Sequence, residues 1–145
     1  MLFRSMHWPD AGTHEAPGSG NALFDTYDWL DARIETLEKT GIARTRIIVD
    51  PGIGFGKGVA ENLAILNGLA LFHGLGCPVL LGASRKRFIG ALSNEAPVEA
   101  RLGGSIAVAM KAAEQGAQII RVHDVPETVQ ALKIWRGMRD QGLAG

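Results

Sequence analysis

Three short apolar runs constrain the fold of this chain, because each ends abruptly in glycine, charge or a hydroxyl group. They occupy residues 46–50, 78–81 and 118–122 and are rich in isoleucine, valine and leucine. Continuous apolar runs of this length are typical of strands that are buried on both faces of a parallel sheet. A parallel sheet gathers the loops after its strands at one edge, where ligands bind. The polar residues that follow these runs are therefore the candidate site.

Segments with helical periodicity separate the runs. Helices are expected over residues 23–39, 61–72, 86–92, 98–114 and 127 to about 139. We also expect a short strand at residues 2–6 and a long loop at residues 7–21. Strand and helix then alternate every 30 to 40 residues or so, which is typical of βαβ units. The expected fold class is α/β, with a parallel sheet built from about four strand–helix units.

Charge and cysteine content narrow the class of protein. Lys+Arg and Asp+Glu both number 15, so the zero net charge gives no argument for binding nucleic acid or an anionic membrane. Cys77 stands alone, which excludes a disulfide framework and suits the cytoplasm. No apolar stretch approaches the roughly 18 residues that a membrane span needs. We expect one cytoplasmic domain, residues 1–145, that acts on small molecules.

Residues 50–57, Asp-Pro-Gly-Ile-Gly-Phe-Gly-Lys, form a glycine loop after the first of these runs. A phosphate-binding P-loop would need glycine where this chain has Pro51, and serine or threonine where it has Gly58. The glycine spacing also fails to match a dinucleotide-binding fingerprint. Two interpretations of Asp50 stay open. Its carboxylate could accept paired hydrogen bonds from an amino-heterocycle, or it could cap a turn or helix.

The loops after the other two runs add cations, a hydroxyl and an imidazole. Ser84, Arg85 and Lys86 follow one run directly. Arg121 and His123 alternate at the end of the next, so we expect them to share one side of it. A solvated basic turn would explain each group taken singly. Together with Asp50 they suit an anionic substrate such as a phosphate ester.

Other conspicuous residues carry less information. Gly82 precedes Ser84 and is small enough to let a ligand lie close. The remaining histidines have no metal-ligand spacing with one another or with the cysteine: His7, His14 and His73. The tryptophans lie in separate segments and are interpreted as packing residues: Trp8, Trp29 and Trp135.

The order of these segments resembles dihydropteroate synthase. The resemblance runs from about residue 6 to residue 139 and rests on residues 50–57, 84–86, 88–90, 101, 104–105 and 121–125. It implies a (β/α)8 TIM barrel of the pterin-binding family. It also implies a transferase of folate biosynthesis that joins p-aminobenzoate to 6-hydroxymethyl-7,8-dihydropterin pyrophosphate and releases pyrophosphate with the help of Mg²⁺.

Residue by residue, the resemblance implies that Asp50 hydrogen-bonds the pterin ring. Arg121 would lie over the pterin and, with His123, contact the pyrophosphate. Lys86 would reach both the pterin and p-aminobenzoate. The resemblance therefore makes Lys86, Arg121 and His123 the catalytic residues.

The second substrate would occupy a neighbouring part of the site. By the same resemblance, Ser84 and Arg85 would help to hold p-aminobenzoate, Phe55 would line its pocket, and Gly82 would lie against the substrates. The physical chemistry agrees with this assignment. Cations that stabilise the departing pyrophosphate lower the barrier, so the aniline amine suffices as the nucleophile.

The length of the chain implies half of such a barrel, because a complete one takes about 250 residues. Residues 6–7 resemble the end of the fifth strand. The resemblance then places the asparagine that binds Mg²⁺ in the first half, and no metal ligand in these residues. We expect a homodimer or a self-associated half barrel, and whether this chain is active alone stays open.

Two alternatives are kept. One is the pterin-binding domain of a methyltetrahydrofolate–corrinoid methyltransferase, and the other is a non-catalytic remnant that self-associates. The basic residues at positions 84–86 and 121–123 favour the synthase, because the methyltransferase has no pyrophosphate to hold.

Overall fold

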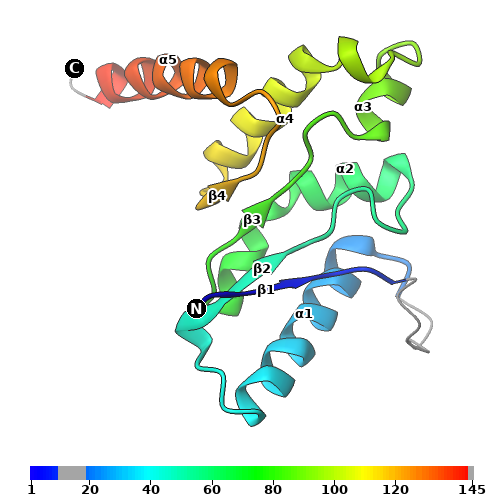
Figure 1. Ribbon diagram of the computed structural model, residues 1–145, viewed down its shortest axis with the longest axis vertical. Coiled ribbons are helices and arrows are strands. Elements are labelled where there is room, and N and C mark those ends of the chain that lie inside the picture. The colour runs from blue at the N-terminus through cyan, green and yellow to red at the C-terminus, as the bar shows by residue number, and fades with distance from the viewer. Residues whose placement is uncertain (10–18, 144–145) are drawn as a thin grey trace.

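The computed structural model describes residues 1–9 and 19–143, in which parallel strands alternate with helices (Figure 1). The strands are β1 (Phe3–Met6), β2 (Ile47–Asp50), β3 (Leu80–Leu81) and β4 (Ile119–Ile120). β1 pairs with β2 and β3 with β4, and a parallel bridge between Val49 and Val79 connects the two pairs. The spatial order therefore follows the chain order, and the expected parallel α/β fold is confirmed.

Helices form in each expected segment, but those expected over residues 61–72 and 98–114 are interrupted. They are α1 (Ala22–Lys39), α2 (Val59–Asn67), α3 (Arg87–Leu92), α4 (Leu102–Glu114) and α5 (Val125–Leu143). Short 3₁₀ helices add Arg44–Arg46, Leu69–Leu75 and Val98–Ala100. The loop expected over residues 7–21 lies largely outside the described residues, as does His14.

Two helices are shorter than predicted, and the one expected over residues 98–114 is a 3₁₀ helix at Val98–Ala100 followed by α4 from Leu102. The pattern in residues 61–72 predicts a continuous helix, but α2 ends at Asn67 and the chain goes on as a 3₁₀ helix from Leu69. Gly68 lies between them, and a side chain there would collide with Leu23 of α1. The break therefore coincides with close packing of α1 against Gly68. The spacing of apolar residues within one segment cannot predict such a contact with another helix.

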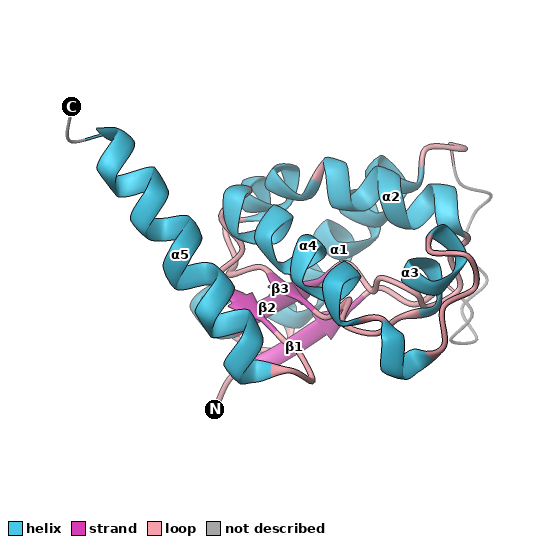
Figure 2. Cartoon of the chain, turned by 90° about the horizontal axis from the view of Figure 1, so that it is seen from above, coloured by secondary structure: helices cyan, strands magenta, loops and turns pink. Residues whose placement is uncertain are grey.

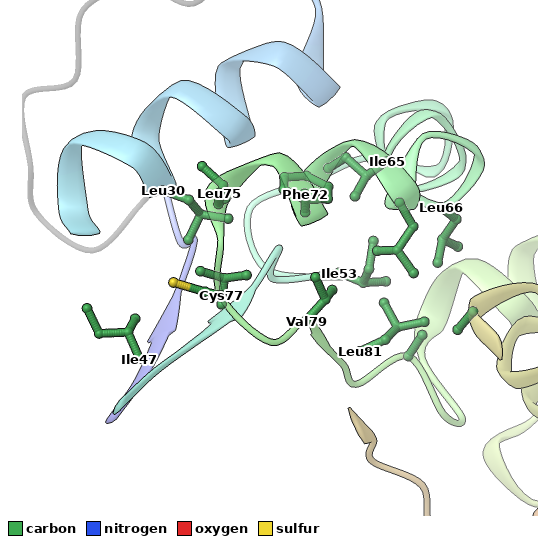
Figure 3. Packing of buried hydrophobic residues seen from close by; sticks show 14 of the residues in the cluster. Leu30, Ile47, Ile53, Ile65, Leu66, Phe72, Leu75, Cys77, Val79 and Leu81 are labelled. Atoms are coloured by element: carbon green, nitrogen blue, oxygen red, sulfur yellow. The ribbon is translucent and has the colours of Figure 1, made fainter. Parts of the chain in front are cut away.

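The core lies between one face of the sheet and the helices that cover it (Figure 3). Alternate strand residues face this core, and all are buried: Ile47, Val49, Val79 and Leu81. Side chains of α1, α2 and the following 3₁₀ helix pack on them: Leu30, Ile34, Ile65, Leu69 and Phe72. Each fully buried side chain of this size stabilises the fold by about 1.5–3 kcal/mol relative to the exposed side chain.

α1 is held at its start by Asn21, whose side chain accepts hydrogen bonds from the backbone N–H groups of Leu23 and Phe24. α5 behaves differently, because much of its length extends away from the rest of the chain (Figure 2). Two of its apolar side chains are largely exposed, Ile134 at 62% and Met138 at 65%. Among the described residues, no helix has both the length and the apolar character needed to cross a membrane.

Candidate functional site

Asp50 ends β2 with its carboxyl group almost completely buried, at 2% exposure. One carboxyl oxygen accepts a hydrogen bond from the N–H of Gly52 at 2.9 Å, and the other lies 3.6 Å from the Arg4 guanidinium. Burial raises the pKa of Asp50, although this hydrogen bond and nearby cations oppose the rise. The turn-capping interpretation is confirmed. The second oxygen faces the Arg4 guanidinium.

The glycine loop follows Asp50 and needs its glycines for two reasons. Gly52, Gly54 and Gly56 all have left-handed backbone angles, with φ of 70°, 79° and 60°. A side chain at Gly52 would also collide with the carbonyl oxygen of His7, which follows β1. The loop can therefore lie directly against the end of β1.

Lys86 lies against the same loop. Its ammonium group donates to the carbonyl oxygen of Ile53 and lies 4.1 Å from the centre of the Phe55 ring. Burial lowers the pKa of Lys86 from 10.5 to about 8; Asp50 opposes this change, and Arg121 adds to it. The residues predicted to share one site, Asp50, Phe55, Lys86 and Arg121, are thus brought within electrostatic or direct contact.

Arg121 follows β4 and packs over Gly82. The backbone N–H of Arg121 donates to Leu81 at 2.8 Å, and a side chain at Gly82 would lie 2.9 Å from the Arg121 guanidinium. Gly82 therefore makes room for Arg121 itself. Whether Gly82 also lies against a substrate stays a prediction.

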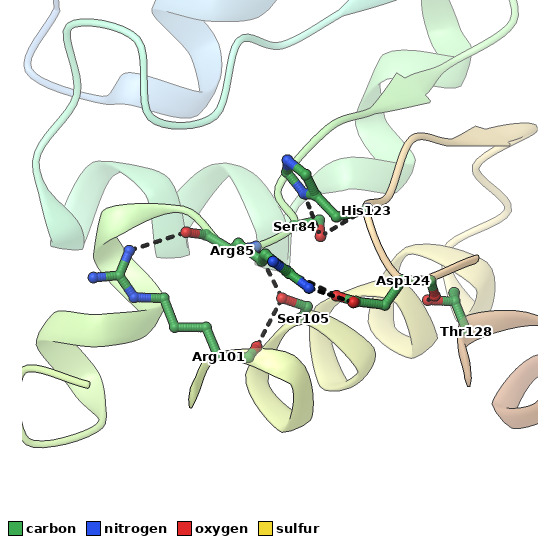
Figure 4. Close-up of polar contacts among 7 residues, drawn as sticks. All are labelled: Ser84, Arg85, Arg101, Ser105, His123, Asp124 and Thr128. Carbon is green, nitrogen blue, oxygen red and sulfur yellow. Dashed lines mark hydrogen bonds and ion pairs between the residues drawn. The ribbon is translucent and has the colours of Figure 1, made fainter. Parts of the chain in front are cut away.

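Ser84 and His123 join the loops that follow β3 and β4 (Figure 4). The Ser84 hydroxyl lies 3.0 Å from Nδ1 of His123 and accepts the backbone N–H of His123 at 3.2 Å. The two residues are thus oriented by each other, and a ligand held by one would lie close to the other.

Arg85 makes the second connection between these loops (Figure 4). Its guanidinium donates to both carboxylate oxygens of Asp124, at 3.0 and 2.5 Å, which lowers the pKa of Asp124. Its backbone has a left-handed φ of 56°, and its N–H donates to Ser105 at 2.8 Å. Arg101 donates to its carbonyl oxygen at 2.9 Å. In this structure the guanidinium holds Asp124, so its contact with p-aminobenzoate stays a prediction.

Two residues at the site were not singled out by the sequence. Arg4 lies on β1, where the pairing of Met6 with Asp50 puts Arg4 on the same face of the sheet as Asp50. Trp8, interpreted as packing, is 42% exposed, and its ring lies 5.0 Å from that of Phe55. Alternation along residues 2–6 could have found Arg4, but no local pattern indicates the contact of Trp8.

A cavity of about 490 Å³ opens beside these groups, between the glycine loop and the start of α3. Its lining includes Lys57, Asn62, Lys86 and Arg87. Glu95 also lines it, so the cations of the lining outnumber its carboxylates, which suits an anionic ligand. In the described part of the chain, no three histidine, cysteine, aspartate or glutamate residues cluster closely enough to hold a metal ion.

Comparison with known proteins identifies the family. A model of the pterin binding enzyme family matches residues 5–123. The chain belongs to this family. Among its pterin-binding relatives, the dihydropteroate synthase of Escherichia coli strain K12 is 46% identical over 120 residues, which cover 83% of this chain and 42% of the relative. The dihydropteroate synthase of Neisseria meningitidis serogroup B is 45% identical over 113 residues, which cover 76% of this chain and 40% of the relative.

Solved structures of pterin-binding enzymes support the same family assignment. A Xanthomonas albilineans dihydropteroate synthase with 4-aminobenzoic acid superposes with a TM-score of 0.87 at 40% identity and covers 95% of this chain. The same enzyme in complex with 7,8-dihydropteroate gives the same TM-score and identity. The resemblance to dihydropteroate synthase is confirmed. The chain spans 42% of the Escherichia coli relative and 49% of the first of these Xanthomonas chains.

Proposed function

We propose that this chain supplies the pterin- and pyrophosphate-binding half of a dihydropteroate synthase, a transferase of folate biosynthesis. One observation carries the proposal: the buried carboxylate of Asp50 lies among the charges of Arg4, Lys86 and Arg121 at the ends of parallel strands. The carboxylate suits a planar heterocycle with neighbouring ring N–H and amino groups. The cations suit the anionic group attached to that heterocycle.

The proposed reaction is the one that the resemblance to dihydropteroate synthase implies. The amine nitrogen of p-aminobenzoate attacks the pterin methylene carbon, and the bond from that carbon to the pyrophosphate oxygen breaks. Pyrophosphate leaves with the electron pair, and the amine loses a proton. Arg121 and His123 would contact the departing pyrophosphate, where a fixed positive charge stabilises the transition state. Lys86 would reach both the pterin and p-aminobenzoate, where the two substrates meet.

p-Aminobenzoate would lie beside Lys86. Phe55 offers the face of a ring, and Ser84 offers a hydroxyl already oriented by His123. In support, the Xanthomonas albilineans enzyme was solved with 4-aminobenzoic acid. Arg85 would help to hold p-aminobenzoate by positioning this loop through Asp124, or directly after a change of rotamer. Gly82 would border the substrates beneath Arg121.

The architecture proposed is the C-terminal half of a (β/α)8 barrel, with residues 1–145 as a partial pterin-binding domain. In support, β1 and β4 each pair on one side only within the described residues. A homodimer or self-associated half barrel would cover these edges. By the same resemblance, Mg²⁺ would assist the reaction, and its main protein ligand would lie outside these residues. The cytoplasmic location stays a prediction.

Calorimetry tests the proposed function. The chain should bind 6-hydroxymethyl-7,8-dihydropterin pyrophosphate in the presence of Mg²⁺, and Arg121→Leu should weaken this binding more than binding of the same pterin without pyrophosphate. Equal losses for both ligands would contradict the role of Arg121 and favour a methyltransferase-type pterin domain. No heat from a correctly folded chain would favour the non-catalytic remnant.

A further inference from the structure

Asn62 of α2 is a buried amide that is bonded to the glycine loop through both ends. Its side chain is 2% exposed in the folded chain. Its oxygen accepts the N–H of Gly54 at 2.8 Å. Its NH₂ donates to the carbonyl oxygens of Gly58 at 2.8 Å and Lys57 at 3.3 Å. One helix residue thus fixes backbone groups at the middle and at the end of the loop.

Lys57, the last residue of the loop, also bonds to the loop backbone. Its ammonium group donates to the carbonyl oxygens of Gly52 at 2.9 Å and Phe55 at 3.0 Å. It also lies 3.4 Å from the carbonyl oxygen of His7, beyond the end of β1. Lys57 therefore ties the glycine loop to itself and to the neighbouring strand end.

The loop needs such restraint, because glycine loses more conformational freedom on folding than any other residue. Two of its other residues, Ile53 and Phe55, touch Lys86 directly. The Ile53 carbonyl accepts from the Lys86 ammonium group, and the Phe55 ring lies 4.1 Å from it. A side chain at Gly54 would come within 2.8 Å of Cδ of Lys86, so the loop also limits the space around Lys86.

We propose that Asn62 and Lys57 are positioning residues, which hold the glycine loop against Lys86 and so fix the place and the hydration of its ammonium group. The inference rests on the proposed function, since it concerns the same site. Its physical link, from Asn62 through the loop to Lys86, is measurable without turnover or substrate.

The hydration of Lys86 provides the readout. Burial is the main cause that lowers the pKa of Lys86 to about 8. The charge of Asp50 opposes this change, and the charges of Arg121 and Arg4 add to it. A looser loop would admit water, and the pKa of Lys86 would rise towards 10.5.

The experiment is a pH titration of the chain with ¹³C-labelled lysine side chains, followed by NMR and assigned with Lys86→Gln. Asn62→Ala should raise the pKa of Lys86 by about one unit. Asn67→Ala is the matched control, because Asn67 is exposed at the end of the same helix. An unchanged or lowered pKa in a folded Asn62→Ala variant, or an equal rise in the control, would overturn the proposal.

Lys57→Met provides a second test if Asn62→Ala does not fold. It should raise the pKa of Lys86 in the same direction, and Lys57→Arg, which keeps a cation and N–H donors, should recover part of the change. An unchanged pKa in folded Lys57→Met would overturn the role of Lys57. A chain that shows these shifts but binds no pterin pyrophosphate would contradict the proposed function while leaving the positioning role supported.

Discussion

The Asp50 carboxyl is 2% exposed, and its burial raises its pKa because the ionised form loses hydration. A raised folded-state pKa stabilises the fold below the unfolded pKa, and this contribution is lost as pH rises through the folded value. Ionisation of this buried carboxyl therefore lowers the free energy of unfolding. The 3.6 Å contact with Arg4 offsets part of that loss.

Asp50→Asn should separate stability from binding. The amide oxygen can still accept the N–H of Gly52, and the buried charge is gone. We expect the free energy of unfolding at pH 7 to stay equal or rise by about 1 kcal/mol, while pterin binding falls at least about tenfold. Urea denaturation and calorimetry on the same sample measure both. A variant that loses stability and keeps its affinity would contradict the assignment of Asp50.

His7 should make the fold sensitive to acid. It is 6% exposed, and its ring meets Trp29 edge-on at 5.1 Å. Burial is the main cause that lowers the pKa of His7 from 6.5 to about 4; the charge of Lys57 adds to it, and Asp25 opposes it. Because the folded value is the lower one, the stabilisation is complete above pH 6.5 and is lost as pH falls through 4.

Between pH 7 and pH 4.5, the titration of His7 should reduce the free energy of unfolding by about 2 kcal/mol. Urea denaturation across this range should therefore show a smaller loss in His7→Asn than in the natural chain. The difference between the two profiles isolates His7 from the carboxylates, which titrate in both. Parallel profiles would show that His7 does not titrate as its burial implies.

At the scale of single elements, adjacent glycines in α4 offer a matched pair. At Gly103 an added side chain would meet open space, whereas at Gly104 it would collide with Ile89 of α3. Gly103→Ala should raise the free energy of unfolding by about 0.5 kcal/mol, because alanine favours helix. Gly104→Ala should lower it by about 1–2 kcal/mol, because Ile89 must shift in a packed interface. Thermal denaturation of both variants measures the contrast, and equal effects would contradict the packing of α3 on α4.

The sequence predicted the existence and type of each element well, because helical periodicity and continuous apolar runs are local properties. It also predicted that Asp50, Lys86 and Arg121 meet, since parallel strands bring the loops after them together. It could not predict the ion pair of Arg85 with Asp124. That pair depends on a left-handed backbone at Arg85 and on distant contacts. The contacts of Trp8 and Asn62 were missed for the same reason.

At the scale of the whole molecule, the described sheet has two lateral edges, β1 and β4, and parallel strands with open edges pair readily with other strands. The residues of β4, Ile119 and Ile120, are only partly buried. A second copy of the chain could pair its β1 with this β4. α5 offers a competing surface, because Ile134 is 62% exposed.

Two charge substitutions distinguish these surfaces. If the sheet edges associate, Ile119→Lys should raise the dimer dissociation constant at least about tenfold, since it buries an unpaired charge, while Ile134→Lys should leave the constant unchanged. Light scattering over a range of concentrations, with circular dichroism to confirm folding, measures this. If only Ile134→Lys dissociates the dimer, the interface lies on α5 and not at the sheet edges. A folded monomer at every concentration of the natural chain would exclude self-association.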